Sequence, residues 1–310
     1  MKRLFAILAT LVSFCTISGA ETLQKDIDFH FFDTIEASSS FQITVKRGEA
    51  YSVNLVVDTR IENFLDVRLN GNILVLGIDE KNFTRDKIKN MFNQKDSSPL
   101  VLIANVYVPE DAEIKVIKLE DSAVLTSEIP FNTEENLSIE ATETSAVKDL
   151  EISSGSLSIH TGKKASVAVS GKSSAVSILA RNSSRVELSL QADKLDIEND
   201  SFSELKVTGA VTEIKTISSG FSKLSLKTSS TAVLRVNAKG NVQIDASEAD
   251  VNDVEVELNS AECRVKPKSS LVMTLVSNAK LFFDGTPALT IKKIANSSVM
   301  LLSEAAADNK

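Results

Sequence analysis

Pairs of apolar residues, separated by one other residue, recur at nearly constant intervals along the chain. Eight such pairs follow short polar links between residues 167 and 301, and the intervals between their first members are 19, 19, 19, 18, 21, 18 and 18 residues. The pairs are Val167/Val169, Val186/Leu188, Leu205/Val207, Leu224/Leu226, Val242/Ile244, Cys263/Val265, Leu281/Phe283 and Val299/Leu301. Alternation with a period of two is typical of a strand that buries one face.

A second apolar position stands some ten residues before several of these pairs. The matched positions are Ile114 before Val124, Leu137 before Val147, Leu157 before Val167, Val176 before Val186, Leu195 before Leu205, and Ile214 before Leu224. The links between them consist mainly of Ser, Asn, Gly and Ala, which favour turns. None of the links has a helical period, which excludes helical repeats and a leucine-rich horseshoe.

A repeat of this length is too short to fold alone, so each copy must bury its apolar side chains against its neighbours in a stack. Short strands joined by tight turns, with each coil hydrogen-bonded to the next at roughly 4.8 Å, form a parallel β-helix. We therefore predict an all-β chain with about ten coils of 18–21 residues over residues 111–303. In such a stack Val186, Leu205 and Leu224 lie in one column.

One short phrase shows the repeat most clearly. The sequence "LDIENDSFSELKV" (Leu195–Val207) returns as "IKTISSGFSKLSL" (Ile214–Leu226). Phe221 occupies the position in the second phrase that Phe202 occupies in the first. We expect both rings to be buried between neighbouring repeats, like the other apolar side chains. No aromatic cluster in the sequence marks a binding face.

The N-terminal part is predicted to form strands of less regular spacing. The strand-like segments are "FQITV" (Phe41–Val45), "YSVNLVV" (Tyr51–Val57), "FLDVRL" (Phe64–Leu69), "ILVLGI" (Ile73–Ile78) and "LVLIANVYVP" (Leu100–Pro109). The sequence "NGN" at Asn70–Asn72 predicts a tight hairpin turn. Between the last two strands, an insertion at 79–99 is predicted to contain a short amphipathic helix at 84–93.

The insertion carries a local cluster of basic residues on an otherwise acidic chain. The cluster is Lys81, Arg85, Lys87, Lys89 and Lys95. We interpret it as a solvated helix face, with docking of a partner as the alternative.

The first twenty residues are predicted to be a secretory signal that is removed. Lys2 and Arg3 precede an apolar run, and small residues at Ser18–Ala20 suit a signal peptidase. A retained membrane anchor would need roughly 20 apolar residues, more than this run provides. A lipoprotein signal at Cys15 is a further alternative, although bulky Phe14 stands where a small residue is usual.

The predicted organisation thus has four parts. Residues 1–20 are the signal, 21–110 form an N-terminal β region with the first coils, 111–303 form the repeat region, and 304–310 form a polar tail. No stable insertion into a membrane is expected beyond the signal, because no second hydrophobic segment follows.

Charge and cysteine content narrow the possible partners. The net charge of −8 becomes −10 when Lys2 and Arg3 leave with the signal, which argues against nucleic acid or an anionic membrane surface as partner. Cys263 is then the only cysteine, so no internal disulfide can form. We interpret Cys263 as a small buried residue in an apolar column rather than a reactive thiol.

The sequence contains no recognisable catalytic motif. It lacks HExxH, GxSxG, a glycine-rich phosphate loop and a cysteine pair, and His30 and His160 are its only histidines. His160 is interpreted as a surface turn residue. We assign no catalytic, cofactor-binding or metal-binding residues and expect no cofactor.

One acidic segment, "DASEADVNDVEVE", keeps an enzymatic alternative open. Its carboxylates are Asp245, Glu248, Asp250, Asp253, Glu255 and Glu257. Two of them could face each other across a groove, as in a polysaccharide lyase or glycosidase, or several could bind calcium. The chain has no Trp and only Tyr51 and Tyr107 as tyrosines, whereas ligand sites are usually rich in aromatic residues. We therefore interpret the segment as surface charge.

The segments "FDTIEASSSFQITVKRGEAYSVNLVVDTRIENFLDVRLNGNILVLGID" and "VYVPEDAEIKVIKLEDSAVLTSE", followed by the coils, resemble the bacterial putative autotransporter adhesin head, or GIN domain. Matching positions are Asp58, Gly71, Leu74, Val75, Pro109 and Ala123. The resemblance covers most of 32–303 and implies a right-handed parallel β-helix, exported to the envelope or surface, with no enzymatic residues to carry over. The departures are the insertion at 79–99 and Asp121-Ser122, where the family often has Ser-Gly.

Taken together, the sequence predicts an exported, non-enzymatic β-helical protein located in the periplasm, on the cell surface or outside the cell. Its long polar faces are expected to bind a glycan or an envelope protein, as an adhesin-like module. The alternative is a β-helical polysaccharide lyase or glycosidase that acts through residues 245–257. A third interpretation is a structural scaffold that binds no ligand. Weak homo-oligomers are expected, because the ends of a β-helix leave backbone groups unpaired.

Overall fold

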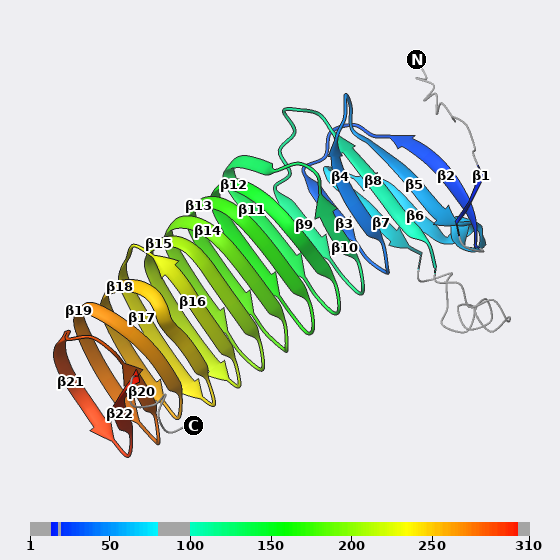
Figure 1. Ribbon diagram of the computed structural model, residues 1–310. Coiled ribbons are helices and arrows are strands. Elements are labelled where there is room, and N and C mark those ends of the chain that lie inside the picture. Colours follow the sequence, from blue (N-terminus) through cyan, green and yellow to red (C-terminus); the bar gives the residue numbers. More distant parts are fainter. Residues whose placement is uncertain (1–13, 18–19, 80–99, 303–310) are drawn as a thin grey trace.

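The protein, seen in a computed structural model that describes residues 14–17, 20–79 and 100–302, is an elongated rod of stacked strands (Figure 1). Strands make up 73% of the chain and helix 3%, and a β-solenoid of about ten turns forms most of the rod. The predicted all-β parallel β-helix is confirmed. Within the described residues, no helix is both long enough and apolar enough to cross a membrane.

The strands divide into an N-terminal group and the coils. The N-terminal strands are β1 (Phe14–Ile17), β2 (Ala20–Asp28), β3 (Thr34–Ala37), β4 (Gln42–Arg47), β5 (Ser52–Asp58), β6 (Leu65–Asn70), β7 (Ile73–Ile78) and β8 (Leu102–Val108), with a 3-10 helix, η1 (Thr59–Phe64), between β5 and β6. The coils comprise β9 (Val116–Leu119), β10 (Val124–Ser127), β11 (Phe131–Ala141), β12 (Ala146–Thr161), β13 (Ser166–Ala180), β14 (Arg185–Asn199), β15 (Glu204–Gly220), β16 (Lys223–Ser229), β17 (Thr231–Gly240), β18 (Gln243–Asn259), β19 (Glu262–Val276), β20 (Lys280–Phe283), β21 (Ala288–Ala295) and β22 (Ser298–Leu301).

Each coil pairs in parallel with the next, and equivalent apolar residues stack in columns. Val186 is paired with Leu205, which is paired with Leu224, and all three side chains are buried. The predicted column is therefore confirmed. Cys263 occupies the same column three coils further on from Leu205, between Ile244 and Leu281, and is completely buried.

The register differs from the sequence prediction after Leu224. The residue paired with Leu224 is Ile244, so the buried pair of this coil begins at Ile244 and the expected start at Val242 is wrong. The cause is one extra residue in the link around Ser230, which has a left-handed φ of 61°. Val242 is buried nonetheless, because it occupies the inward position of the turn that precedes β18, opposite Ser222.

A smaller correction applies to the first coils. Leu125 pairs with Val147 and is fully buried, whereas Val124 pairs with Ala146 and is partly exposed. The inward residue of this coil is therefore Leu125 rather than Val124. Adjacent apolar residues look alike in sequence, and a shift by one residue places the other one on the buried face.

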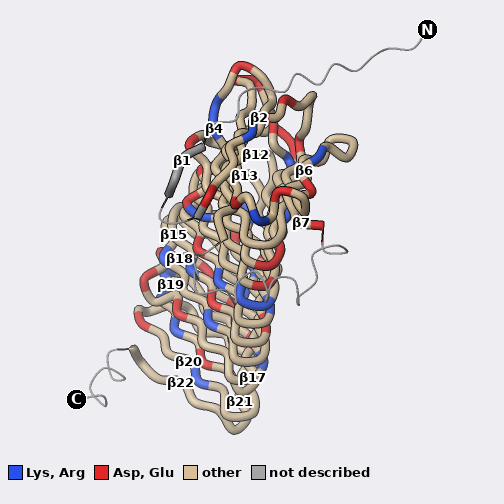
Figure 2. The backbone as a smooth tube through the Cα atoms, turned by 90° about the vertical axis from the view of Figure 1, so that its right-hand side faces the viewer, with Lys and Arg blue, Asp and Glu red and all other residues tan. Residues whose placement is uncertain are grey.

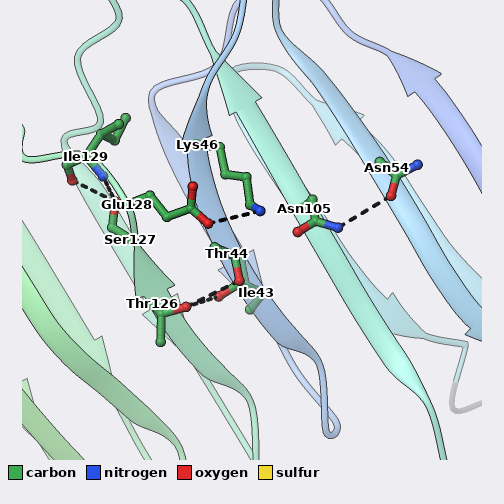
Figure 3. A network of polar contacts seen from close by, with 9 residues as sticks. All are labelled: Ile43, Thr44, Lys46, Asn54, Asn105, Thr126, Ser127, Glu128 and Ile129. Carbon is green, nitrogen blue, oxygen red and sulfur yellow. Dashed lines mark hydrogen bonds and ion pairs between the residues drawn. The ribbon is translucent and has the colours of Figure 1, made fainter.

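The N-terminal strands continue the solenoid and then change direction. β4 pairs in parallel with β10 and with β8, whereas β5 pairs antiparallel with β8 and with β2. On the outer face, polar contacts cross this junction (Figure 3): Thr44 Oγ1 and Thr126 Oγ1 lie 3.3 Å apart, and Lys46 forms an ion pair with Glu128 at 3.0 Å. These contacts tie the N-terminal sheet to the first coil.

The predicted hairpin is present between β6 and β7, and Gly71 in its turn has a φ of 62°. η1 was not predicted; its N-cap is Asp58, whose side chain accepts a hydrogen bond from the Arg60 backbone N–H. The predicted helix at 84–93 and all residues of the basic cluster lie outside the described residues.

Candidate binding surface

The six predicted carboxylates all lie on β18, and each contacts a neighbouring residue or coil. Glu248 pairs with Lys227 at 2.9 Å, Asp250 pairs with Lys268, and Glu255 pairs with Lys292 at 2.7 Å. The other three accept hydrogen bonds: Asp245 from Ser247, Asp253 from Ser270 and Glu257 from Asn237. The strand therefore distributes these carboxylates among separate contacts, as expected for surface charge.

This arrangement gives no support to the enzymatic alternative. A glycosidase general acid needs a raised pKa. The pKa of Glu255 is instead lowered, because Lys292 donates a hydrogen bond to it and adds a positive charge, and these effects outweigh partial burial. In the part of the chain that the structure describes, no three His, Cys, Asp or Glu side chains lie close enough together to hold a metal ion.

The single cysteine of the coils and the two histidines lie in three different environments. Cys263 is completely buried, and burial raises the pKa of its thiol, as expected for an inert core residue. His160 is exposed but lies in strand β12 rather than in a turn, which corrects the prediction. His30 is exposed in the loop between β2 and β3.

The most unusual surface feature is an aromatic pair that sequence reasoning expected to be buried. Phe202 and Phe221 project from the same turn of successive coils, and their side chains are 60% and 51% exposed. Their rings are stacked, with centroids 4.8 Å apart and an interplanar angle of 4°. Neighbouring coils repeat at roughly 4.8 Å, which matches the distance between the ring centroids, so the ring stack follows directly from the stacking of the coils.

The backbone under this pair is strained in one coil. Ser201 and Phe202 have φ values of 54° and 70°. A bulky side chain rarely takes a left-handed conformation, and such strain is concentrated at functional sites. In the next coil Gly220, with a φ of 72°, occupies the position of Ser201 and precedes Phe221. An exposed ring that is retained at this cost is a candidate binding residue.

A buried polar layer supports the turn that carries the two rings. The Asn199 Oδ1 atom accepts a hydrogen bond from Ser218 in the next coil, and Ser218 Oγ lies 3.0 Å from Thr216 Oγ1. All three side chains are buried. At the outer side of the turn, Ser219 donates a hydrogen bond to Asp200 at 2.8 Å. These cross-coil contacts hold the two turns in the same orientation.

Two shallow hollows flank the aromatic pair on the adjoining faces of the rod. One has a volume of about 650 Å³ and ends beside the turn at Glu198; the other, of about 360 Å³, begins beyond the turn at Glu204. The first is lined by His160, Leu179, Asp196, Lys215, Ile217 and Arg235, among others. The second is lined by Lys206, Lys223, Gln243, Asp245, Glu262 and Arg264, among others.

Charges of both signs are interleaved on these faces, as Figure 2 shows for the coils as a whole. In the second hollow, Glu204 pairs with Arg185 at 2.8 Å, and Lys206 pairs with Glu187 at 3.1 Å. Exposed pairs of this kind contribute little to stability but present many donors and acceptors without a strong net field. The surface therefore offers hydrogen-bonding groups of both kinds, with positive and negative charges close together.

The sequence did contain one signal for this site. Phe202 and Phe221 stand inside the polar links "NDSFS" and "SSGFS", outside the alternating strand pattern. An apolar residue in a link points outward when the next residue occupies the inward position, as Ser203 and Ser222 do here. The expectation that both rings are buried is wrong for this reason.

Fold and surface together define a parallel β-helix with a polar exterior and one exposed aromatic turn. The chain belongs to the family described as "Putative auto-transporter adhesin, head GIN domain", whose model matches residues 31–189 and 157–287. None of the curated protein sequences matches this chain. The family assignment agrees with the resemblance found in the sequence.

Solved structures of low sequence identity cover nearly the whole chain. A putative adhesin from Parabacteroides merdae is 14% identical, covers 92% of this chain and 97% of its own, and has a TM-score of 0.46. A putative adhesin from Parabacteroides distasonis is 11% identical over 92% and 98%, with a TM-score of 0.49. A putative lipid binding protein from the same species is 14% identical over 92% and 98%, with a TM-score of 0.45.

Proposed function

We propose that this chain is an exported, non-enzymatic binding module of the adhesin type that binds a neutral glycan at the Phe202–Phe221 turn. The observation that carries the proposal is the exposed stack of these two rings on a strained turn between two polar hollows. Membership in an adhesin family supports a binding role in general. The ligand class is inferred from the chemistry of the surface.

The two rings offer apolar area that is only two coils wide, which fits the apolar face of a sugar ring better than an extended protein interface. Hydroxyl, carboxylate and ammonium groups stand on both sides of the rings, at Ser219, Glu198, Glu204 and Lys223. These groups can exchange hydrogen bonds with sugar hydroxyls. The acidic net charge of −8 disfavours anionic polymers as ligands.

The binding proposal is tested by comparing the native chain with Phe202→Asn/Phe221→Asn on an array of neutral and charged glycans. Asn tolerates the left-handed backbone at Phe202, and Asn241 occupies the equivalent position in the next coil, so this variant should fold. Loss of both rings should weaken binding at least about tenfold, which corresponds to about 1.4 kcal/mol.

Phe31→Ala provides a matched control, because Phe31 is 48% exposed and packs against Tyr51 far from the turn. Its glycan binding should equal that of the native chain. Glycan binding that survives in the double variant would refute the assignment of the site. Capture of an envelope protein, without any glycan signal, would show that the partner class is wrong.

Export is a separate part of the proposal. The basic start and apolar run before Ala20 support a cleaved signal. The intact mass of the protein recovered from the producing cell should correspond to a chain that begins at Glu21. A mass that includes a lipid on Cys15, or the uncleaved leader, would contradict this expectation.

A further inference from the structure

The last coil leaves apolar side chains uncovered at the end of the rod. Leu289, Ile291 and Ile294 of β21 are 51%, 58% and 41% exposed. Their partners in the preceding coil are buried core residues, namely Leu271, Met273 and Leu275, respectively. The exposed row is thus the open cross-section of the interior: the columns of the core end there without a lid in the described part of the chain.

The backbone at this end is also unpaired on one side. β21 is paired only with β19 and β22 only with β20, as far as the described strands extend. Figure 1 shows both strands at the tip of the rod. A free strand edge beside an apolar row is a template for another strand.

Natural proteins often protect such an edge with a charged side chain. Lys292 occurs at an irregularity in β21, but its ammonium group reaches back along the rod and pairs with Glu255 at 2.7 Å. Glu255 belongs to β18, two coils away. One of the two lysines of β21 is therefore directed away from the free edge.

The opposite end of the rod differs. There the chain passes from β5 to β6 through η1, and Ile61 of η1 is fully buried. The apolar residues Val57 and Leu74 of the neighbouring strands are fully buried as well. The edge strand β6 at this end carries Leu65, Val67 and Leu69, which are partly buried against the core. Among the described residues, this end therefore offers a less exposed apolar row than β21, and a head-to-tail stack is less favourable than a contact between two last coils.

We propose that two copies of this chain associate tail to tail around a twofold axis, with the last coils in contact. A twofold contact brings the same surface of each copy together. Each apolar row then covers the other, and the free edges of β21 can pair antiparallel across the axis. The same contact covers both open ends, so association stops at the dimer instead of continuing into a fibre.

The size of the end surface sets the strength of this contact. The last coil runs from Ala288 to Leu301, which is 14 residues. A standard stable interface uses roughly 20–30 residues on each side. The dimer should therefore be weak and concentration-dependent, with a Kd on the order of micromolar or higher.

Sedimentation velocity of the exported chain, from about 1 to about 300 μM to span that range, tests the proposal. The weight-average mass should rise toward that of a dimer and no further. Ile291→Asp should remain monomeric throughout, because it places a charge in the contact; the native side chain is already 58% exposed, so folding should be unaffected. Ile217→Asp is the matched control, since Ile217 is 44% exposed on a strand in the middle of the rod.

Hydrogen exchange distinguishes the proposed occupant from others. In the native chain the β21 amides that face away from β19 should become protected as concentration rises, whereas in Ile291→Asp these amides should exchange rapidly at every concentration. A native monomer at all concentrations, or a dimer that Ile291→Asp leaves intact, would overturn the proposal. Protection of the outward-facing β21 amides in a monomer would overturn the proposal and show that a segment of the same chain covers the end. Because the Phe202–Phe221 turn lies several coils away, Ile291→Asp should not alter glycan binding, so the two proposals fail independently.

Discussion

Two buried serines beside the aromatic turn provide a quantitative test of the column arrangement. Ser203 and Ser222 occupy equivalent inward positions of successive turns, and both are completely buried. Neither hydroxyl has a hydrogen-bond partner. At the same position the next coils carry Val242 and Ala261, which are apolar and also buried. The column therefore accepts an apolar side chain at this point.

The expected effect of Ser222→Ala follows from the balance of two terms. A buried hydroxyl without a partner costs about 1–3 kcal/mol, and Ala removes that cost. The cavity left by one oxygen atom reduces the gain slightly. We expect Ser222→Ala to raise the free energy of unfolding by about 1 kcal/mol. Ser203→Ala should act in the same direction, and the double variant need not be additive because the two residues are in adjacent coils.

Ser145→Ala is the matched control at the same turn position nearer the N-terminus. The Ser145 hydroxyl lies 2.7 Å from the Thr142 carbonyl oxygen and 3.2 Å from that of Leu119, so it is satisfied. Its neighbours in the column are Ala123 and Ala165, so an alanine fits sterically. Here the substitution should lower stability by about 1 kcal/mol, because favourable hydrogen bonds are lost.

Urea unfolding followed by circular dichroism measures both effects. With an m value of about 3 kcal/mol/M, 1 kcal/mol corresponds to a shift of about 0.3 M in the midpoint. Ser222→Ala should move the midpoint upward and Ser145→Ala downward, with unchanged m. Destabilisation by both substitutions would refute the reasoning, because it would mean that Ser222 makes a stabilising contact in the folded chain.

Two further predictions concern the backbone and a partly buried ion pair. A Cβ at Gly209, where φ is 111°, would lie 2.0 Å from the Leu190 carbonyl oxygen, whereas a Cβ at Gly71, where φ is 62°, would have no neighbour within 4 Å. In urea unfolding, Gly209→Ala should lower the free energy of unfolding by about 3 kcal/mol or more, and Gly71→Ala should lower it by about 1 kcal/mol. Equal losses of stability in the two variants would contradict this prediction. The pKa of Asp58 is lowered, since hydrogen bonds and charge from Arg60 together outweigh burial, the largest single effect, which raises it. Its stabilisation is present above the unfolded pKa near 3.8 and is lost as pH falls through the lower folded value. Asp58→Asn should therefore cost about 2 kcal/mol at pH 7 and progressively less below pH of about 4; a constant cost would exclude titration of Asp58 as the cause.

The stacking of coils could be predicted from the sequence because it depends on a strict rule. Successive strand residues point to opposite faces, and a slip by one residue would expose the whole apolar set. Repeats of 19 residues with the same alternation can therefore stack only in the register seen for Val186, Leu205 and Leu224. Val242 was misplaced because an inward turn position and an inward strand position carry the same kind of residue. Nothing local shows that the extra residue at Ser230 has shifted the later strand.

The candidate site could be predicted only in part. The carboxylates of β18 form separate ion pairs and hydrogen bonds, as expected for surface charge. The cationic partners Lys227, Lys268 and Lys292 come from other coils and are fixed by the stack. The aromatic pair was missed because hydrophobicity alone favours burial of Phe. Its exposure depends on the direction of the turn, which the backbone conformations of Ser201 and Gly220 set.

Three consecutive positions of the turn that carries the rings differ in backbone conformation and in the direction of the side chain. The first takes a left-handed conformation, as in Lys163, Asn182 and Ser201, and reverses the chain. The third is small and faces inward, as in Ala165, Ser184 and Ser203. The residue between them, exemplified by Ser183 and Phe202, does not face inward, although in these two coils it also has a left-handed φ, of 67° and 70°. Its side chain can therefore change without disturbing the core of the stack, within the residues that tolerate this backbone conformation. Because the coils repeat at roughly 4.8 Å, these middle positions form a row of closely spaced side chains along the rod. If the proposed site is correct, substitutions in this row can change the ligand while the fold is kept, and Phe202 and Phe221 are two exposed apolar residues within it.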